Sequence, residues 1–187
     1  RTFHGQSVYG ELLNVPLLLW KPGSIPAGRV VTRTVQTVDL MPTLLAASGL
    51  AGPAGMQGRS ILPLLTGSME EAPVFAVRAK TGMTAGSPPP RGSESYAYVS
   101  RGWKLVRHVI RMPGDTGPEF ELFDAVNDPL DARDVAMANP EVVTRLASEL
   151  EEIRSRTVAA RLKPDSADAG SLSPEELERL RSLGYIQ

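Results

Sequence analysis

The chain has 187 residues, of which 42% are hydrophobic, and a formal net charge of −1. This composition is typical of a folded globular protein of one medium or two small domains, and it argues against a disordered chain. A nearly neutral chain has no strong field that attracts nucleic acid or an anionic membrane. Cysteine is absent, which excludes disulfides, thiolate zinc sites and a cysteine nucleophile within these residues.

The first predicted elements are a helix and two strands. Residues 7–14 have apolar side chains at helical spacing and are predicted to form a helix. Residues 15–20 form a continuous apolar run, typical of a strand that is covered on both faces, and far too short to cross a membrane. Residues 29–38 are rich in valine and are predicted to hold a second strand.

A helix is predicted next, with Asp39 as its N-cap and Gly49 just beyond its end. Further along, apolar alternation predicts a small antiparallel sheet in which Arg101 and Gly102 form a hairpin turn. Helical spacing predicts a long helix after Asn139, and Ser173 with Glu176 forms the capping box of another. The predicted strands of the sheet are residues 73–79, 96–100, 103–111 and 120–123.

Five sequence blocks occur in an order that is typical of one enzyme family. The most informative is H-G-Q-S-V-Y-G-E-L-L-N-V-P-L, which begins at His4. Together the blocks make the chain resemble the sulfatase family of the alkaline phosphatase superfamily. Gly10 and Asn14 depart from the residues that the family usually has there, glutamate and arginine, so the subfamily stays open. The five blocks are residues 9–17, 38–49, 57–65, 121–129 and 180–185.

The resemblance implies the fold. We expect the C-terminal part of an alkaline-phosphatase-like α/β sheet domain, followed by a small antiparallel sheet packed with a C-terminal helix. Residues 1–68 would be the end of the α/β catalytic domain, and residues 69–187 a C-terminal α+β subdomain. The chain would then be the C-terminal portion of a longer enzyme, called the parent below.

The resemblance also implies an activity for that parent, which is the hydrolysis of sulfate esters of small molecules or glycans. It implies a formylglycine or related nucleophile and one divalent cation, calcium by family resemblance. Residues upstream of this chain would supply both, so we expect the fragment alone to be inactive. The same resemblance suggests a periplasmic or secreted protein. It indicates no nucleic-acid partner.

His4 is the candidate catalytic residue of this segment, because the matching family position binds the sulfate group or the leaving-group oxygen. Cleaving a sulfate ester develops negative charge on the departing oxygen, and a positioned acid or cation lowers that barrier. Histidine can supply a proton near neutral pH. The alternative is a capping or surface histidine near a chain end.

Other polar groups are predicted to be structural. Residues 87–91, S-P-P-P-R, formally match the pattern of the formylglycine precursor, but three prolines favour polyproline II rather than the helix start that this motif needs. His108 and the basic residues around it are predicted to lie on a solvated strand face. An oxygen-rich cluster lacks EF-hand spacing and is predicted to consist of solvated turn and cap residues. The cluster comprises Asp124, Asn127, Asp128, Asp131 and Asp134, and the basic residues are Arg101, Lys104, Arg107 and Arg111.

Two alternative functions stay open at this stage. One is a hydrolase or transferase of the same superfamily that acts on phosphate or phosphonate esters. The other is a non-catalytic, sulfatase-like binding module. The upstream nucleophile and metal ligands would separate these, because a serine or threonine nucleophile favours phosphoryl chemistry.

Overall fold

The structure is a computed structural model that describes residues 7–78, 94–110, 116–159 and 173–182. The chain divides into two compact units, Arg1–Glu151 and Glu152–Gln187. The first unit contains the sheet.

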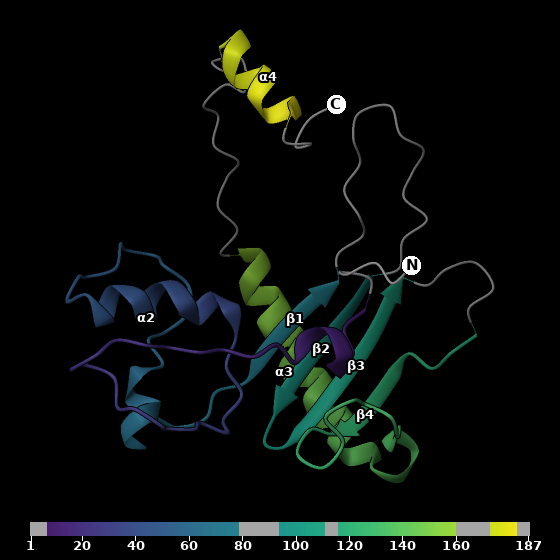
Figure 1. Ribbon diagram of the computed structural model, residues 1–187. Helices are drawn as coiled ribbons and strands as arrows, with labels where there is room; N and C mark the ends of the chain where they lie inside the picture. The colour runs from purple at the N-terminus through teal and green to yellow at the C-terminus, as the bar shows by residue number, and fades with distance from the viewer. Residues whose placement is uncertain (1–6, 79–93, 111–115, 160–172, 183–187) are drawn as a thin grey trace. The chain divides into compact units, whose positions relative to one another are not determined.

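The sheet has four strands: β1 (Val74–Arg78), β2 (Glu94–Ser100), β3 (Trp103–Ile110) and β4 (Phe120–Asp124). Their order is β1-β2-β3-β4, and every neighbouring pair is antiparallel (Figure 1). Arg101 and Gly102 join β2 to β3 with φ of 51° and 77°. Positive φ at both central residues is what a two-residue hairpin favours, so the predicted turn is confirmed.

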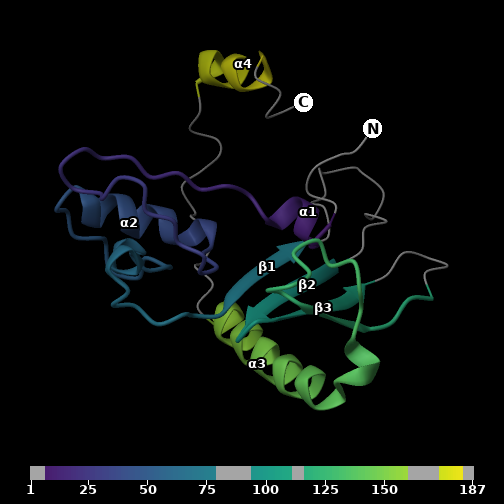
Figure 2. The same ribbon diagram turned by 60° about the horizontal axis from the view of Figure 1, so that its bottom comes forward.

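One face of the sheet is covered by helix α3 (Pro140–Ala159), as Figures 1 and 2 show. Leu146 and Leu150, one helical turn apart, are completely buried. Strand alternation directs Leu105 and Leu122, which are equally buried, to this face. The long helix predicted after Asn139 is therefore confirmed, and so is the antiparallel sheet packed with a helix.

The opposite face is covered by residues from the start of the chain (Figure 2). Val8 is buried in one apolar cluster with Ala97, Val106 and Phe123 of the sheet. Just after it lies α1 (Gly10–Leu13), a single turn where the sequence predicted a helix over residues 7–14. The sheet is thus enclosed between α3 and a segment that ends about 60 residues before β1 begins.

In the sequence, α2 (Leu40–Ala47) lies between α1 and the first strand of the sheet. This helix and Gly49 after its end, with φ of 71°, agree with prediction. Asp39 lies at the predicted N-cap position of α2, but its carboxylate makes no cap hydrogen bond to this helix. It accepts instead from the backbone N–H groups of Gln36 and Arg59. The 3₁₀ helices are η1 (Thr37–Asp39), η2 (Leu62–Thr66) and, after β4, η3 (Ala136–Ala138).

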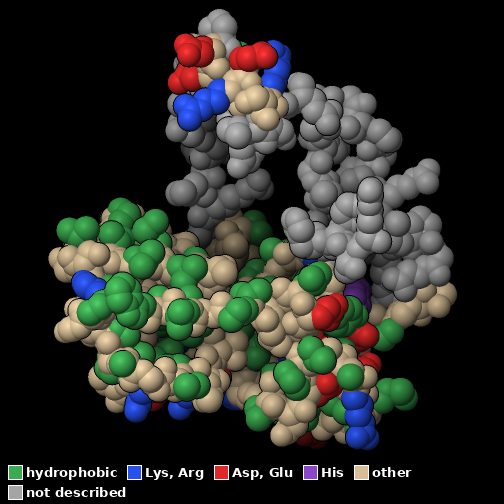
Figure 3. All heavy atoms as spheres, in the orientation of Figure 1, with side chains coloured by type: hydrophobic (Ala, Val, Ile, Leu, Met, Phe, Trp, Pro, Cys, Tyr) green, Lys and Arg blue, Asp and Glu red, His purple; other side chains and the backbone are tan. Residues whose placement is uncertain are grey.

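The strands predicted at residues 15–20 and 29–38 do not form. A strand needs a neighbour for its hydrogen-bond ladder, and the four described strands pair only with one another. Leu18 is 91% and Trp20 82% exposed as a result. Figure 3 shows many hydrophobic side chains on the surface of the part that contains α2.

The second unit contains α4 (Pro174–Ser182). The Glu176 backbone N–H donates to Ser173 Oγ, and the Ser173 N–H donates to Glu176 Oε2 at 2.8 Å. These reciprocal bonds are the predicted capping box. Among the described residues, no helix is long and apolar enough to span a membrane.

Candidate functional site

The predicted catalytic residue His4 lies outside the described residues, and so do Ser87 and Arg91 of the proline-rich motif. The roles that the sequence assigns to them stay predictions. The described chain begins at Ser7, and Tyr9 is its first residue with a polar contact to the sheet.

Four side chains on the face covered by the N-terminal segment form a hydrogen-bonded set, called here the Glu121 network: Tyr9, Ser95, His108 and Glu121. Glu121 Oε2 accepts from the Tyr9 hydroxyl at 2.5 Å and lies 2.8 Å from His108 Nε2. Ser95 Oγ lies 2.9 Å from His108 Nδ1. A carboxylate next to Nε2 favours the proton on that nitrogen, which leaves Nδ1 of the neutral ring to accept from the Ser95 hydroxyl.

The register of the sheet brings these residues together. Ser95 and His108 are cross-strand partners on β2 and β3. Glu121 on β4 pairs with Val106, so His108 is its diagonal neighbour on the same face, within reach of long side chains. The register shifts between Glu94 and Ser95, and such irregularities can redirect nearby side chains. The fold therefore creates the network from three strands and the N-terminal segment.

The order serine, histidine, glutamate is that of a hydrolase triad, but the geometry argues against a nucleophile here. Ser95 is 1% exposed, so its hydroxyl is closed to a substrate. The pKa of Tyr9 is raised well above its ordinary value, first by burial and then by the hydrogen bond to Glu121. Tyr9 therefore stays a protonated donor, and the network is suited to holding side chains in place.

The prediction that His108 lies on a solvated strand face is wrong. Its side chain is 20% exposed, and both ring nitrogens have partners. Arg107 also has partners, since it pairs with Glu119 and Glu151. Alternating polar residues on a strand usually indicate a solvated face, but here the N-terminal segment covers the face of His108, and α3 contacts Arg107 on the opposite face. A signal was available in the two-residue spacing of Glu121 on β4 and Glu119 just before it, opposite a histidine.

A second polar contact joins the N-terminal segment to the same face. Lys104 and Asp131 form an ion pair whose side chains are 7% and 2% exposed. Asp131 Oδ2 also accepts from the Gly10 backbone N–H at 2.7 Å. Both residues were predicted to be solvated, which is wrong. A buried charge is tolerated when it is paired and hydrogen-bonded, as this one is.

The other aspartates of the oxygen-rich cluster behave as the sequence predicts. Asp124 accepts from the backbone N–H groups of Val126 and Asn127, each at 3.0 Å, as in an Asx turn. Asp128 and Asp134 likewise accept from backbone N–H groups of nearby residues. Within the described ranges, no group of three or more histidine, aspartate or glutamate side chains is placed to hold a metal ion.

The two departures from the sulfatase pattern meet at one carbonyl. A Cβ atom on Gly10 would lie 2.0 Å from Pro129 O, far closer than real contacts allow. The Pro129 carbonyl therefore leaves no room for a glutamate side chain at position 10. Asn14 Nδ2 donates a hydrogen bond to this same carbonyl at 2.5 Å. The departures are therefore coupled features of one packing contact.

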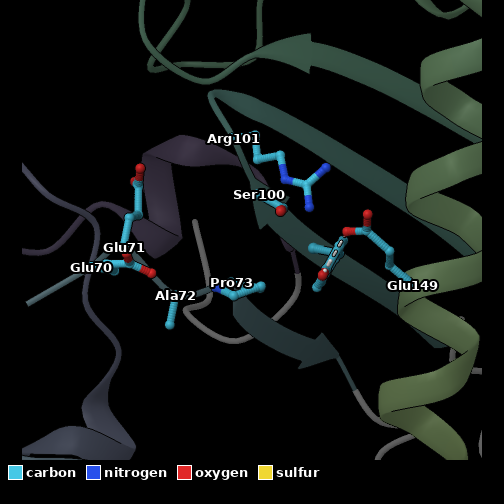
Figure 4. Close-up of a pocket in the computed structure, with 8 residues that line it drawn as sticks. Glu70, Glu71, Ala72, Pro73, Ser100, Arg101 and Glu149 are labelled. Carbon is cyan, nitrogen blue, oxygen red and sulfur yellow. Dashed lines mark hydrogen bonds between the residues drawn. The ribbon is translucent and has the colours of Figure 1, made fainter.

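A hollow of about 510 Å³ lies on the other side of the sheet, beside the β2–β3 turn (Figure 4). Tyr98 donates to Glu149 Oε2 at 2.9 Å within it. Three carboxylates against one guanidinium give an excess of negative charge, which disfavours an anionic sulfate ester. Its lining residues are Glu70, Glu71, Ala72, Pro73, Tyr98, Ser100, Arg101 and Glu149.

Comparisons with known proteins agree with the resemblance. Residues 1–156 match the family model described as N-sulphoglucosamine sulphohydrolase, C-terminal. Arylsulfatase K of Xenopus laevis is 30% identical over 155 residues, which cover 82% of this chain and 28% of that protein. The chain thus spans about a quarter of the length of this curated relative.

Solved structures show the same fold. The structure of Ps i-CgsB in complex with k-i-k-neocarrahexaose has a TM-score of 0.55 and 21% identity, over 89% of this chain and 32% of that one. A protein solved with its substrate D-glucosamine-2-N,6-O-disulfate has a TM-score of 0.54 and 19% identity, over 79% and 29% of the two chains. The expected fold class is confirmed. The chain belongs to the sulfatase family and corresponds to the C-terminal portion of such enzymes.

Proposed function

We propose that this chain completes an enzyme that hydrolyses sulfate esters. The observation that carries the proposal is the family match over residues 1–156, which includes both the His4 block and the enclosed sheet. In this proposal, residues 1–68 form the end of the catalytic α/β domain. Residues 69–187, called here the sheet subdomain, hold those residues in place.

His4 is the residue of this chain that takes part in the chemistry. It binds the transferring group or gives a proton to the leaving oxygen, where negative charge develops. A formylglycine nucleophile and a divalent cation, calcium by family resemblance, come from residues upstream. When bound, the cation neutralises charge on the reacting group. The described residues offer no set of ligands for it.

The proposed substrate is a sulfated small molecule or glycan in a periplasmic or secreted setting. This is supported by one structural neighbour that was solved with its substrate D-glucosamine-2-N,6-O-disulfate, and by another solved with k-i-k-neocarrahexaose. Those ligands belong to the neighbours, and the choice of sugar for this chain is left to experiment.

The test is turnover of an aryl sulfate and an aryl phosphate by the full-length parent, with His4→Ala beside the wild type. We expect sulfate hydrolysis, and a loss of roughly 10²- to 10⁴-fold in kcat in the variant, the usual range for a general acid or base. Faster phosphate turnover would favour the phosphoryl alternative, and no turnover of either ester would favour a binding module. A His4→Ala variant with full kcat would remove His4 from the mechanism.

A further inference from the structure

We infer that Glu121 is a positioning residue for the reaction: through Tyr9 it fixes the segment that leads to His4 against the sheet. This inference rests on the proposed function. It assigns a role in the reaction to side chains of the sheet subdomain that do not touch the reacting atoms.

Tyr9 is the point at which the N-terminal segment is fixed. Its hydroxyl donates to Glu121 at 2.5 Å, and its ring meets Phe123 edge-on, with centroids 6.1 Å apart. Its backbone carbonyl accepts from the N–H groups of Leu12 and Leu13 and so starts α1. Tyr9 is therefore tied to the sheet at the hydroxyl and to the helix at the backbone.

Glu121 is itself held in place. It stands on β4, and His108 Nε2 lies 2.8 Å from the same oxygen that accepts from Tyr9. The ring of His108 is oriented in turn by Ser95 at 2.9 Å. A carboxylate carried by a strand and bonded to an oriented histidine keeps one conformation, which is what a preorganised support requires.

The sequence connects this support to the chemistry. His4 precedes Tyr9 by five residues, and five residues span at most roughly 18 Å even when fully extended. Because so few residues separate the two, we expect a displacement of Tyr9 to change the placement of His4. A misplacement of about 1 Å at a reacting group can lower a rate by roughly 10²-fold.

The opposite face of the sheet supplies a matched control. Tyr98 donates to Glu149 at 2.9 Å, so Tyr98→Phe and Tyr9→Phe each remove one hydrogen bond between a tyrosine and a glutamate. Tyr98 contacts α3 through this bond and lies on the face away from the N-terminal segment. A purely structural role predicts the same effect for both variants, whereas positioning predicts a difference.

The experiment compares these variants in the full-length parent. Steady-state kinetics with an aryl sulfate, the melting temperature, and hydrogen exchange at the Leu12 and Leu13 amides are measured together. We expect Tyr9→Phe to lower kcat by roughly 10- to 100-fold with KM nearly unchanged, since it misplaces a reacting group. Its Leu12 and Leu13 amides should exchange faster. Tyr98→Phe should lower the melting temperature by a similar amount and leave kcat and these amides nearly unchanged.

Two Glu121 variants test the acceptor directly. Glu121→Gln keeps an oxygen that can accept from Tyr9, whereas Glu121→Leu keeps none, so the glutamine variant should retain more kcat. Equal losses of kcat in Tyr9→Phe and Tyr98→Phe would overturn the inference, and so would unchanged exchange in Tyr9→Phe. A wild-type parent without sulfatase activity would refute the proposed function instead. The exchange measurement would then still decide whether Glu121 holds the segment.

Discussion

Gly10→Ala sets two physical effects against each other, and the structure says which is larger. Alanine is favoured over glycine in a helix by about 0.8–1 kcal/mol, so local propensity predicts a more stable protein. The added Cβ, however, would lie 2.0 Å from Pro129 O and 2.9 Å from the carbonyl carbon. Both are backbone atoms that no rotamer change can move, so the loop that carries Pro129 has to retreat.

The cost follows from what that loop holds. Overpacking alone costs about 1–3 kcal/mol. The retreat also weakens the hydrogen bond from Asn14 to Pro129 O, worth about 1 kcal/mol. It disturbs the bond from the Gly10 N–H to the Asp131 carboxylate, and bonds to charged groups are worth about 1.5–3 kcal/mol. After the gain in propensity is subtracted, we expect Gly10→Ala to destabilise the fold by about 2–4 kcal/mol.

Urea unfolding of the full-length parent measures this loss. Gly23→Ala is the control, since Gly23 has φ of 74° and no atom within 4 Å of the added Cβ. It should cost only the left-handed backbone penalty, about 1–2 kcal/mol. Because Asn14 contacts the same carbonyl, Asn14→Ala should cost less in the Gly10→Ala background than alone. A Gly10→Ala variant as stable as the wild type would refute the close packing against Pro129.

Three further predictions concern stability and association. Lys104→Met should lower the free energy of unfolding by about 3–5 kcal/mol, because it leaves the buried Asp131 carboxylate unpaired. Adding Asp131→Asn, which removes the charge but keeps an oxygen that can accept from the Gly10 N–H, should recover part of that loss in urea unfolding. Burial and the hydrogen bond to Glu149 raise the pKa of Tyr98 to about 12 from 10.0. The protonated Tyr98 hydroxyl therefore contributes fully to the stability of the fold below pH 10, and this contribution is lost as the pH rises toward 12. Tyr98→Phe should flatten that decline in the unfolding midpoint, and an unchanged decline would show that another group causes it. The isolated 187-residue chain should hydrolyse no aryl sulfate, and light scattering should show that it associates, because Leu18 and Trp20 are exposed. The double variant Leu18→Lys, Trp20→Lys should associate less. A monodisperse, active fragment would contradict both expectations.

The elements that sequence analysis predicted correctly are those whose determinants are local. The Arg101–Gly102 turn, the helix after Asn139 and the Ser173 capping box each depend on residues within a few positions of one another. Local patterns of this kind do not require knowledge of what packs against them. They were sufficient for the antiparallel sheet and its helix.

The Glu121 network and the buried ion pair could not be predicted in this way. Tyr9 and Glu121 are 112 residues apart, and Gly10 and Asp131 are 121 apart. Polar alternation on β3 and β4 is consistent with solvent or with another segment above it, and only the fold decides between them. Residues 15–20 show the converse limit, because an apolar run becomes a strand only beside a partner, and no described strand is adjacent to it.

The burial of Val8 against Phe123 has a consequence for biosynthesis. The ribosome delivers the N-terminal segment more than a hundred residues before the strand that completes its core. At about 5–20 residues per second, the interval for the 112 residues between Tyr9 and Glu121 is on the order of 5–20 s. During this time the apolar residues around Val8 lack their native partners, so the nascent chain exposes them to aggregation and to chaperones.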